Sequence, residues 1–290
     1  MSVTRFAPSP TGFLHLGHAY SALTAFEAAR ASGGRFLLRI EDVDRGRARA
    51  DCEAAICDDL AWLGLQWEKP VRRQSEHFDE YKAVLTKLDS MGVLYPCFCT
   101  RKDIAEEILR AGGAPHLMGP DGAIYPGTCR ALSSDERAER IASGAPYALR
   151  LDVAKAVARI GHALVFHEFG AGPDGECREQ SVQAARLGDV VLARKDMPAS
   201  YHIAVVADDA LQGVDLVTRG HDLFHATHVQ RVLQALLGLP VPTYAHHRLI
   251  VDETGKKFSK RDFAVTLQAL RKAGVTPADI RAQFGFATKF

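Results

Sequence analysis

The sequence predicts an α/β fold in which a doubly wound parallel sheet carries an inserted subdomain and ends in a short helical segment. An apolar strand over 2–6, a Pro- and Gly-punctuated loop over 7–12, a helix over 16–31 and a second strand over 35–40 follow one another. A stretch over 95–146 that is rich in Gly, Pro and Cys then interrupts the pattern. A strand–helix–strand unit favours parallel strands with a right-handed crossover, and ligands collect at the carboxyl ends of such strands.

The remaining elements follow in chain order. Helices are expected over 48–63 and 76–91, the second with apolar residues at helical spacing. The interrupting stretch contains one helix, over 133–143, which Ser133 and Glu136 open as a capping pair. Further on, the pattern predicts strands over 147–153 and 189–193, a buried segment over 202–206, a helix over 224–237, a polar loop over 252–262, and two short helices split by Gly274, the second begun by Thr276 and Pro277.

The bulk composition is that of an ordinary globular chain. It has 290 residues, of which 47% are hydrophobic and 24% charged, so it can bury a core without staples. The formal net charge of +1 means that any contact with a nucleic acid depends on a local basic patch. No apolar run is long enough for a membrane span, and the N-terminus lacks the order of a signal peptide, so we expect a cytoplasmic protein. Six cysteines are too few for a disulfide scaffold.

Two histidines mark the loop after the first strand. The run His15-Leu16-Gly17-His18 places them three apart at a helix start, so both rings can face one side of the first turn. A helix N-terminus attracts phosphate, and Gly17 lets a phosphate or a planar ring approach the backbone closely. Imidazole donors there could stabilise charge that develops on an α-phosphate, each contributing about 3 kcal/mol. On its own, this spacing is more typical of local capping or packing.

A glycine-hinged loop near the carboxyl end holds four cations and a hydroxyl, in the run Gly255-Lys256-Lys257-Phe258-Ser259-Lys260-Arg261. Mobile lysines suit a pyrophosphate leaving group, because its negative charge grows in the transition state. Alone, such a loop is more typical of a solvated surface. One motif after the first strand and another near the end of a doubly wound pattern together favour an enzyme that uses a nucleoside triphosphate.

The two motifs resemble the HIGH and KMSKS signatures of class I aminoacyl-tRNA synthetases. Leu16 stands for isoleucine in the first, and Phe258 and Arg261 stand for methionine and serine in the second. The finer similarity is to the glutamate branch, since the glutamine branch usually has Glu in place of Ser9. It is carried by Arg5-Phe6-Ala7-Pro8-Ser9-Pro10-Thr11-Gly12, by Arg39-Ile40-Glu41-Asp42-Val43-Asp44, and by 204–220 with Asp208-Asp209-Ala210-Leu211-Gln212-Gly213. The resemblance implies a Rossmann-like catalytic domain, ATP with Mg²⁺ as co-substrate, and catalytic or ATP-binding roles for His15, His18, Lys257 and Lys260.

Glutamate as the amino acid places a chemical demand on the site. Its two carboxylates and one ammonium must lose their water, so the pocket needs two cations and one anion. The resemblance supplies Arg5 and Arg219 for the carboxylates, Glu41 for the ammonium, and Ser9 and Tyr201 as hydroxyl partners. Guanidinium groups bind carboxylates bidentately and match an uncharged glutamine amide poorly. Which arginine takes which carboxylate stays open.

Three cysteines fall at spacings that suit a metal. Cys97, Cys99 and Cys129 offer three soft ligands, whereas a structural zinc site prefers four. From spacing alone, three buried thiols without a metal are an equal alternative. The resemblance implies one structural Zn²⁺ per chain with Tyr125 as the fourth ligand, and His116 is an outside candidate. A phenolate ligand would lose its proton to the charge of the metal.

The same resemblance implies the domain boundaries. Residues 1–94 form the first half of the catalytic domain, 95–186 the inserted zinc- and acceptor-type subdomain, 187–240 the second half, and 241–290 the KMSKS loop with the C-terminal helical segment. The chain stops about thirty residues beyond Lys260, whereas full-length members of the branch add a large helical domain that reads the anticodon. We therefore expect similarity to the short members of the branch.

Those short members activate glutamate without tRNA and join it to the queuosine at the wobble position of tRNA(Asp). The resemblance thus implies L-glutamate, ATP and tRNA(Asp) carrying queuosine as partners of a monomer that contacts no membrane. Candidate phosphate contacts are the basic residues Arg101, Lys102, Arg130, Arg194 and Lys195. The alternatives are a small synthetase that charges an ordinary acceptor end, a nucleotidyltransferase of another kind, and a non-catalytic RNA-binding protein.

Overall fold

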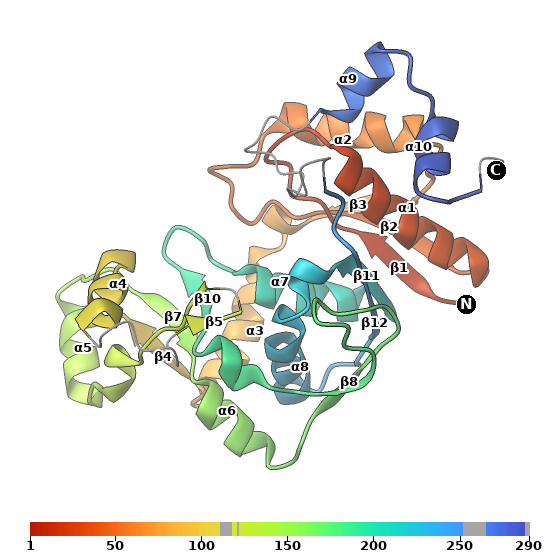
Figure 1. Ribbon diagram of the computed structural model, residues 1–290. Coiled ribbons are helices and arrows are strands. Elements are labelled where there is room, and N and C mark those ends of the chain that lie inside the picture. The colour runs from red at the N-terminus through yellow and green to blue at the C-terminus, as the bar shows by residue number, and fades with distance from the viewer. Residues whose placement is uncertain (111–117, 121, 252–264, 288–290) are drawn as a thin grey trace.

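The structure is a computed structural model that describes residues 1–110, 118–120, 122–251 and 265–287 (Figure 1). Its centre is a parallel sheet with helices on both faces, which confirms the predicted α/β class. Within the described ranges, no helix combines the length and the apolar character that crossing a bilayer requires.

The first half of the sheet contains three parallel strands, β1 (Val3–Phe6), β2 (Arg35–Ile40) and β3 (Glu68–Arg73). Helix α1 (Leu16–Ala31) connects β1 to β2 over the predicted residues, and α2 (Ala50–Trp62) connects β2 to β3. The apolar faces of α1, α2 and β2 pack together into one core. Strand β3 was not predicted, because its sequence EKPVRR is polar and mostly exposed along its first half.

The second half also runs parallel, through β11 (Leu216–Gly220), β12 (Thr243–His247) and β8 (Val165–Glu168), and β9 (Arg178–Ser181) adds an antiparallel edge. The two halves meet where β1 lies beside β11, because the Asp215 amide donates to the Val3 carbonyl at 3.2 Å. Away from this junction, the strand order is β1-β2-β3 in the first half and β11-β12-β8 in the second. The junction is the topological switch point at which ligands bind in such sheets.

Two helices cover one face of the second half. The segment expected only as buried is the first turns of α7 (Tyr201–Leu211), and α8 (Ala226–Leu237) begins two residues later than predicted. The sequence of α7 hides its helical period because Ile203, Ala204, Val205 and Val206 are all buried. A consecutive apolar run of this kind cannot be told from a buried strand by periodicity.

The inserted part forms a separate lobe, on the left in Figure 1. Its sheet is antiparallel and holds β4 (Leu94–Cys97), β7 (Ala148–Leu151) and β10 (Val191–Arg194), the last two of which match predicted strands. The expected capped helix is α5 (Ser134–Ala142), with the Ser133 and Glu136 capping box present. The lobe also contains α4 (Arg101–Arg110), which was not predicted, and the short strands β5 (Met118–Gly119) and β6 (Gly122–Ala123). Two helices border the lobe, α3 (Phe78–Ser90) and α6 (Val153–Ile160).

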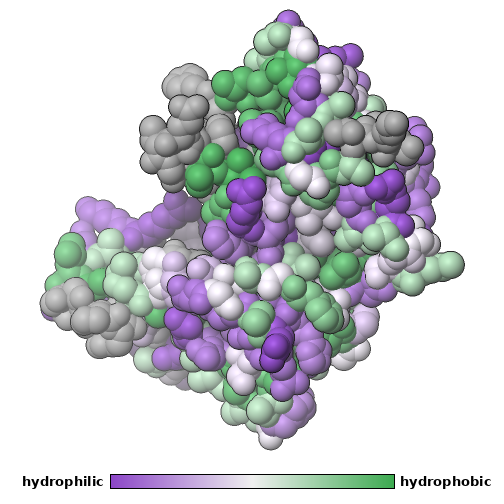
Figure 2. Space-filling view, turned by 45° about the vertical axis from the view of Figure 1, so that its right-hand side comes forward, coloured by the Kyte–Doolittle hydropathy of each residue, from purple (hydrophilic) through white to green (hydrophobic). Residues whose placement is uncertain are grey.

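The carboxyl-terminal helices are α9 (Leu267–Lys272) and α10 (Pro277–Gln283), separated at Gly274 as predicted. The chain enters α9 beside the histidine motif, where Thr266 pairs with His15 and the Leu267 amide donates to the Leu14 carbonyl at 2.8 Å. Figure 2 shows a notch on the surface between the inserted lobe and the upper part of the molecule. The fold therefore packs the carboxyl-terminal helices against α1, next to the histidine motif.

Candidate functional site

A cavity of about 510 Å³ opens at the switch point, between the loop after β1 and the start of α7. It is lined by all five residues predicted to bind glutamate and by one of the two motif histidines: Arg5, Ser9, His18, Glu41, Tyr201 and Arg219. These side chains come from β1, the loop that follows it, the first turn of α1, the end of β2, α7 and β11. The structure thus brings together residues that lie more than two hundred positions apart in the sequence.

The histidine pair caps α1. The Gly17 amide donates to His15 Nδ1 at 3.1 Å, and the His15 amide donates to His18 Nδ1 at 3.2 Å. An imidazole nitrogen that accepts a hydrogen bond carries no proton, so in each neutral ring the proton lies on Nε2. The capping interpretation and the functional one are therefore compatible, because capping fixes the tautomer in which Nε2 donates. The two ring centroids lie 3.8 Å apart, so the donors are close neighbours.

Arg219 is held from three sides at the wall of the cavity. Its Nη1 donates to the Tyr201 hydroxyl at 2.9 Å, its Nη2 to Thr227 Oγ1 at 2.7 Å, and its Nε to His246 Nε2 at 3.1 Å. Only 5% of the residue is exposed. The guanidinium is thus buried and fixed in orientation before any ligand binds.

Arg5 and Glu41 belong to a buried network of alternating charge. Arg5 Nε pairs with Asp209 at 3.0 Å, and Arg39 bridges Asp209 at 2.7 Å to Glu41 at 3.1 Å. Burial acts to raise the pKa of Asp209, but Arg5 and Arg39 outweigh it and hold that pKa below its usual range. The sequence led us to expect a doubly cationic pocket, whereas Arg5 already has a carboxylate partner in direct contact. Among the described residues, no carboxylate pairs directly with Arg219.

Three members of this network, Asp208, Asp209 and Arg39, were given no role in the site from the sequence. Asp208 is fully buried and accepts from Arg72 at 2.8 Å, from Gln74 at 2.9 Å and from the Tyr81 hydroxyl. Asp209 and Asp208 follow a wholly apolar helical turn, and Arg39 interrupts the apolar strand RFLLRI. A charge inside an apolar run is a signal of a buried ion pair, since unpaired burial would be costly.

The cysteines of the inserted lobe form one cluster. The Sγ atoms of Cys97, Cys99 and Cys129 all lie within 4.8 Å of one another, and the Tyr125 hydroxyl lies 3.5 Å from Cys99 Sγ. The same hydroxyl accepts from the Cys129 amide at 2.8 Å. Three thiols and one phenol at this separation fit the donor set of a tetrahedral soft-metal site. Burial raises the pKa of Cys99 to about 12, so a cation would displace a proton there on binding.

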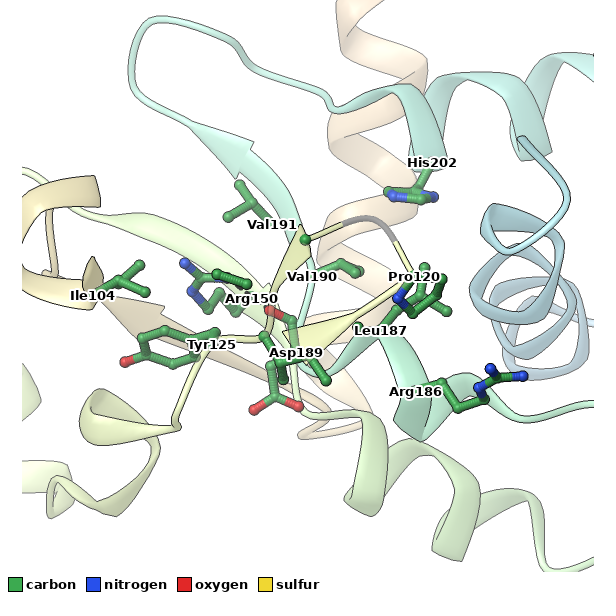
Figure 3. Close-up of a pocket in the computed structure, with 14 residues that line it drawn as sticks. Ile104, Pro120, Tyr125, Arg150, Arg186, Leu187, Asp189, Val190, Val191 and His202 are labelled. Carbon is green, nitrogen blue, oxygen red and sulfur yellow. Dashed lines mark hydrogen bonds between the residues drawn. The ribbon is translucent and has the colours of Figure 1, made fainter. Parts of the chain in front are cut away.

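A second cavity, of about 310 Å³, lies between the cysteine cluster and the start of α7. Figure 3 shows the Arg150 guanidinium beside the Tyr125 ring, and the two are stacked at 3.9 Å. Arg150 also donates to the Asp189 carbonyl at 2.7 Å. His202 lines this cavity, while its neighbour Tyr201 lines the first one, so the start of α7 separates the two.

Three predicted residues lie outside the described part of the chain: the lysines Lys257 and Lys260 of the second motif, and His116. The described chain resumes at Val265, and Thr266 pairs directly with His15. Thr266, five residues after Arg261 in the sequence, therefore lies at the first motif.

The buried histidines predict how stability depends on pH. Burial lowers the pKa of His228 and of His246 to about 4, below the ordinary 6.5. Between these values the unfolded chain binds more protons than the folded one, so the free energy of unfolding falls as pH drops from 7 toward 4. We expect a loss on the order of 2 kcal/mol per histidine by pH 5, measured by urea unfolding. Asp59, whose pKa burial raises to about 6, opposes part of this loss.

His228→Gln should flatten this profile, because one titrating group is removed, and the exposed His162 provides the matched control. Equal stability at pH 7 and pH 5 would show that these rings are protonated in the folded protein.

The parallel sheet, the cavity at its switch point and the capped histidine pair define the class of protein. It is an α/β enzyme with the catalytic fold of a class I aminoacyl-tRNA synthetase.

The chain belongs to the family of class I tRNA synthetases for glutamate and glutamine, because residues 1–285 match its model, "tRNA synthetases class I (E and Q), catalytic domain". A glutamyl-Q tRNA(Asp) synthetase of Rhodobacter capsulatus is 50% identical over 98% of this chain and 99% of its own length. Another, of Nocardia farcinica, is 47% identical over 96% of this chain and 82% of its own length.

A solved glutamate tRNA ligase of Elizabethkingia meningosepticum, in complex with its amino acid, superposes with a TM-score of 0.73 at 28% identity. That match covers 90% of this chain and 52% of the ligase, so the chain spans about half the length of this solved relative. The shared half is the class I catalytic fold.

Proposed function

We propose that this protein activates L-glutamate with ATP, without tRNA, and transfers the glutamyl group to the queuosine at the wobble position of tRNA(Asp). The observation that carries the first half is the convergence of Arg5, Ser9, Glu41, Tyr201 and Arg219 on one cavity beside His18. The transfer to queuosine is supported by two relatives named glutamyl-Q tRNA(Asp) synthetase, which match 98% and 96% of this chain.

The cavity suits glutamate by charge. Arg219 presents a buried guanidinium to one carboxylate, and Arg5 offers its remaining N–H groups to the other. Glu41 receives the ammonium, with the Ser9 and Tyr201 hydroxyls completing the polar lining. Burial acts to raise the pKa of Glu41, and a bound ammonium would restore its charge. Glutamine lacks the second anion and would leave one guanidinium without its charged partner.

Activation then needs only positioning and charge stabilisation. An oxygen of the α-carboxylate attacks the α-phosphorus of ATP, the bond to pyrophosphate breaks, and glutamyl-adenylate forms. The Nε2–H groups of His15 and His18 donate to the phosphate as its charge rises. Lys257 and Lys260 receive the departing pyrophosphate, with Mg²⁺ accompanying ATP. In the transfer step, a hydroxyl of the queuosine cyclopentenediol attacks the carbonyl carbon, and AMP leaves.

The first half of this proposal is tested by glutamate-dependent exchange of pyrophosphate into ATP in the absence of tRNA. We expect exchange with glutamate, and at least about 100-fold less with glutamine at equal concentration, because a buried charged partner is lost. Exchange that required tRNA, or that ran equally with glutamine, would reject it. A nucleotidyltransferase of another kind, or a non-catalytic RNA-binding protein, would show no exchange with either amino acid.

We also propose that the cysteine cluster holds one structural Zn²⁺ through Cys97, Cys99, Cys129 and Tyr125, in the inserted lobe. The support is the fit of three thiols and a phenol described above. The metal would link the end of β4 to the 3₁₀ turn over 128–131 and so brace the lobe.

The purified protein should therefore contain about one zinc per chain by elemental analysis. Cys99→Ser should lower zinc content to well below half and reduce the melting temperature, since metal-binding energy contributes to folding. Cys177→Ser is the matched control, because Cys177 is exposed and outside the cluster. Zinc well under one per chain in the unaltered protein would support three metal-free thiols instead.

A further inference from the structure

Two residues outside the cavity lining stand behind Arg219. His246 faces it from the neighbouring strand, because Arg219 of β11 and His246 of β12 are paired in register. Glu168 ends β8 on the other side of β12, and its Oε2 lies 2.5 Å from His246 Nδ1. All three are at least 95% buried, so they form a chain of contacts inside the protein.

The direction of each hydrogen bond in this chain is dictated by chemistry. An arginine Nε–H only donates, so His246 Nε2 must accept and the imidazole must carry its proton on Nδ1. Nδ1–H then donates to Glu168, which must be the ionised acceptor. The other oxygen of Glu168 accepts from the His246 amide at 2.8 Å and from the Gly170 amide at 2.7 Å. Both carboxylate oxygens of Glu168 therefore accept hydrogen bonds, one from the imidazole and the other from two backbone amides.

We propose that Glu168 and His246 are positioning residues that hold the Arg219 guanidinium ready for a substrate carboxylate. With Tyr201 and Thr227, they engage three of its five N–H bonds and leave one on each terminal nitrogen. Two N–H groups on a fixed plane match the two oxygens of a carboxylate. The inference rests on the proposed function, because it assigns a partner to the same glutamate site.

This chain of contacts also compensates the buried charge of Arg219. Glu168 balances the charge of Arg219 through a neutral imidazole, so the cation is compensated without a carboxylate occupying its binding face. Asp209 compensates Arg5 by direct contact instead. Arg219 therefore keeps its two N–H groups for the ligand, and little reorganisation is needed on binding.

The isosteric variant Glu168→Gln tests the inference. Two backbone amides hold the side-chain oxygen, so the new NH₂ group must face His246 Nδ1 and force the proton onto Nε2. Nε2–H would then oppose Arg219 Nε–H, donor against donor. We expect the KM for glutamate in pyrophosphate exchange to rise about tenfold or more, while the KM for ATP changes less than twofold. An unchanged KM for glutamate would overturn the proposal.

Repeating the Glu168→Gln substitution in a His246→Gln protein distinguishes a positioning role of Glu168 from a merely structural one. In His246→Gln the side-chain oxygen can replace Nε2 as acceptor, whatever group stands at position 168. Glu168→Gln should therefore change the KM for glutamate less than about twofold in that background. If Glu168→Gln raised the KM for glutamate tenfold in both backgrounds, Glu168 would act independently of His246. That result would overturn the proposal.

The controls keep the possible failures distinct. Glu179→Gln changes an exposed carboxylate on the adjacent β9 and should leave both KM values unchanged. Absence of exchange in the unaltered protein would reject the proposed function, whereas normal exchange in Glu168→Gln would reject only the inference. Should Glu168→Gln not fold, His246→Leu, which removes the acceptor, should raise the KM for glutamate tenfold over His246→Gln, and equal values would contradict the proposal.

Discussion

Replacing Arg219 by lysine is expected to lower kcat/KM for glutamate in pyrophosphate exchange by at least about 100-fold, and by up to about 10⁴-fold. Two charge-assisted hydrogen bonds to a substrate carboxylate are lost, each contributing about 1.5–3 kcal/mol. A lysine ammonium is a point charge, and it cannot satisfy Tyr201, Thr227 and His246 at once. The loss should appear mainly in the KM for glutamate, and the KM for ATP should stay within about threefold.

The matched control is Arg231→Lys, on α8, where the guanidinium donates to the Val165 carbonyl outside the cavity. That variant should retain glutamate-dependent exchange, and thermal melting of both proteins separates lost binding from lost folding. An Arg219→Lys protein that melts normally and exchanges pyrophosphate at the unaltered rate would remove Arg219 from the site.

Replacing His18 by alanine is expected to lower kcat for exchange by about 10²–10³-fold with a smaller change in either KM. One preorganised donor to the developing phosphate charge is removed, and such donors contribute about 3–4 kcal/mol. The His18 ring also accepts from the His15 amide, so part of the helix cap is lost at a cost of about 1 kcal/mol in stability. His18→Asn, whose side-chain oxygen can still accept that amide, should keep the stability but not the rate.

His162→Ala is the control, since that ring is exposed and far from α1 in the sequence. The melting temperature and kcat together discriminate the two roles of His18. A capping residue alone would lose stability in His18→Ala and keep its kcat once folded, and that pattern would contradict the catalytic assignment.

The sequence predicted correctly those helices and strands that a local pattern of apolar residues is sufficient to define. Helix α1 and strand β2 matched residue for residue, because an apolar face or run, bounded by Gly33 and Gly34, is decided locally. The local pattern could not predict which strands lie next to each other in a sheet. Predicted strands over 147–153 and 189–193 are present, yet they lie in the antiparallel sheet of the lobe, where β7 is the middle strand and pairs with both β4 and β10. Pairing depends on contacts between distant segments, which periodicity does not encode.

The same distinction holds for the site. The resemblance to the glutamate branch supplied Arg5, Glu41 and Arg219, and the structure places all three in the lining of one cavity. Their partners were not assigned, since Glu168 and His246 lie in segments with no recognisable spacing. These two residues reach Arg219 only because β8, β12 and β11 are neighbours in the sheet. Likewise, no sequence pattern indicated that Asp209 pairs with Arg5 across 204 positions. Ion pairs of this range are products of the fold.

One transfer experiment tests the proposed acceptor, the queuosine of tRNA(Asp), most directly. The protein is incubated with labelled glutamate, ATP and tRNA(Asp) that either carries or lacks queuosine, and the acceptor end of the tRNA is then removed with a nuclease. We predict that only the queuosine-containing tRNA is labelled and that its label survives removal of the acceptor end. Label that disappears with the acceptor end, or that appears equally on tRNA lacking queuosine, would contradict the account and indicate ordinary charging.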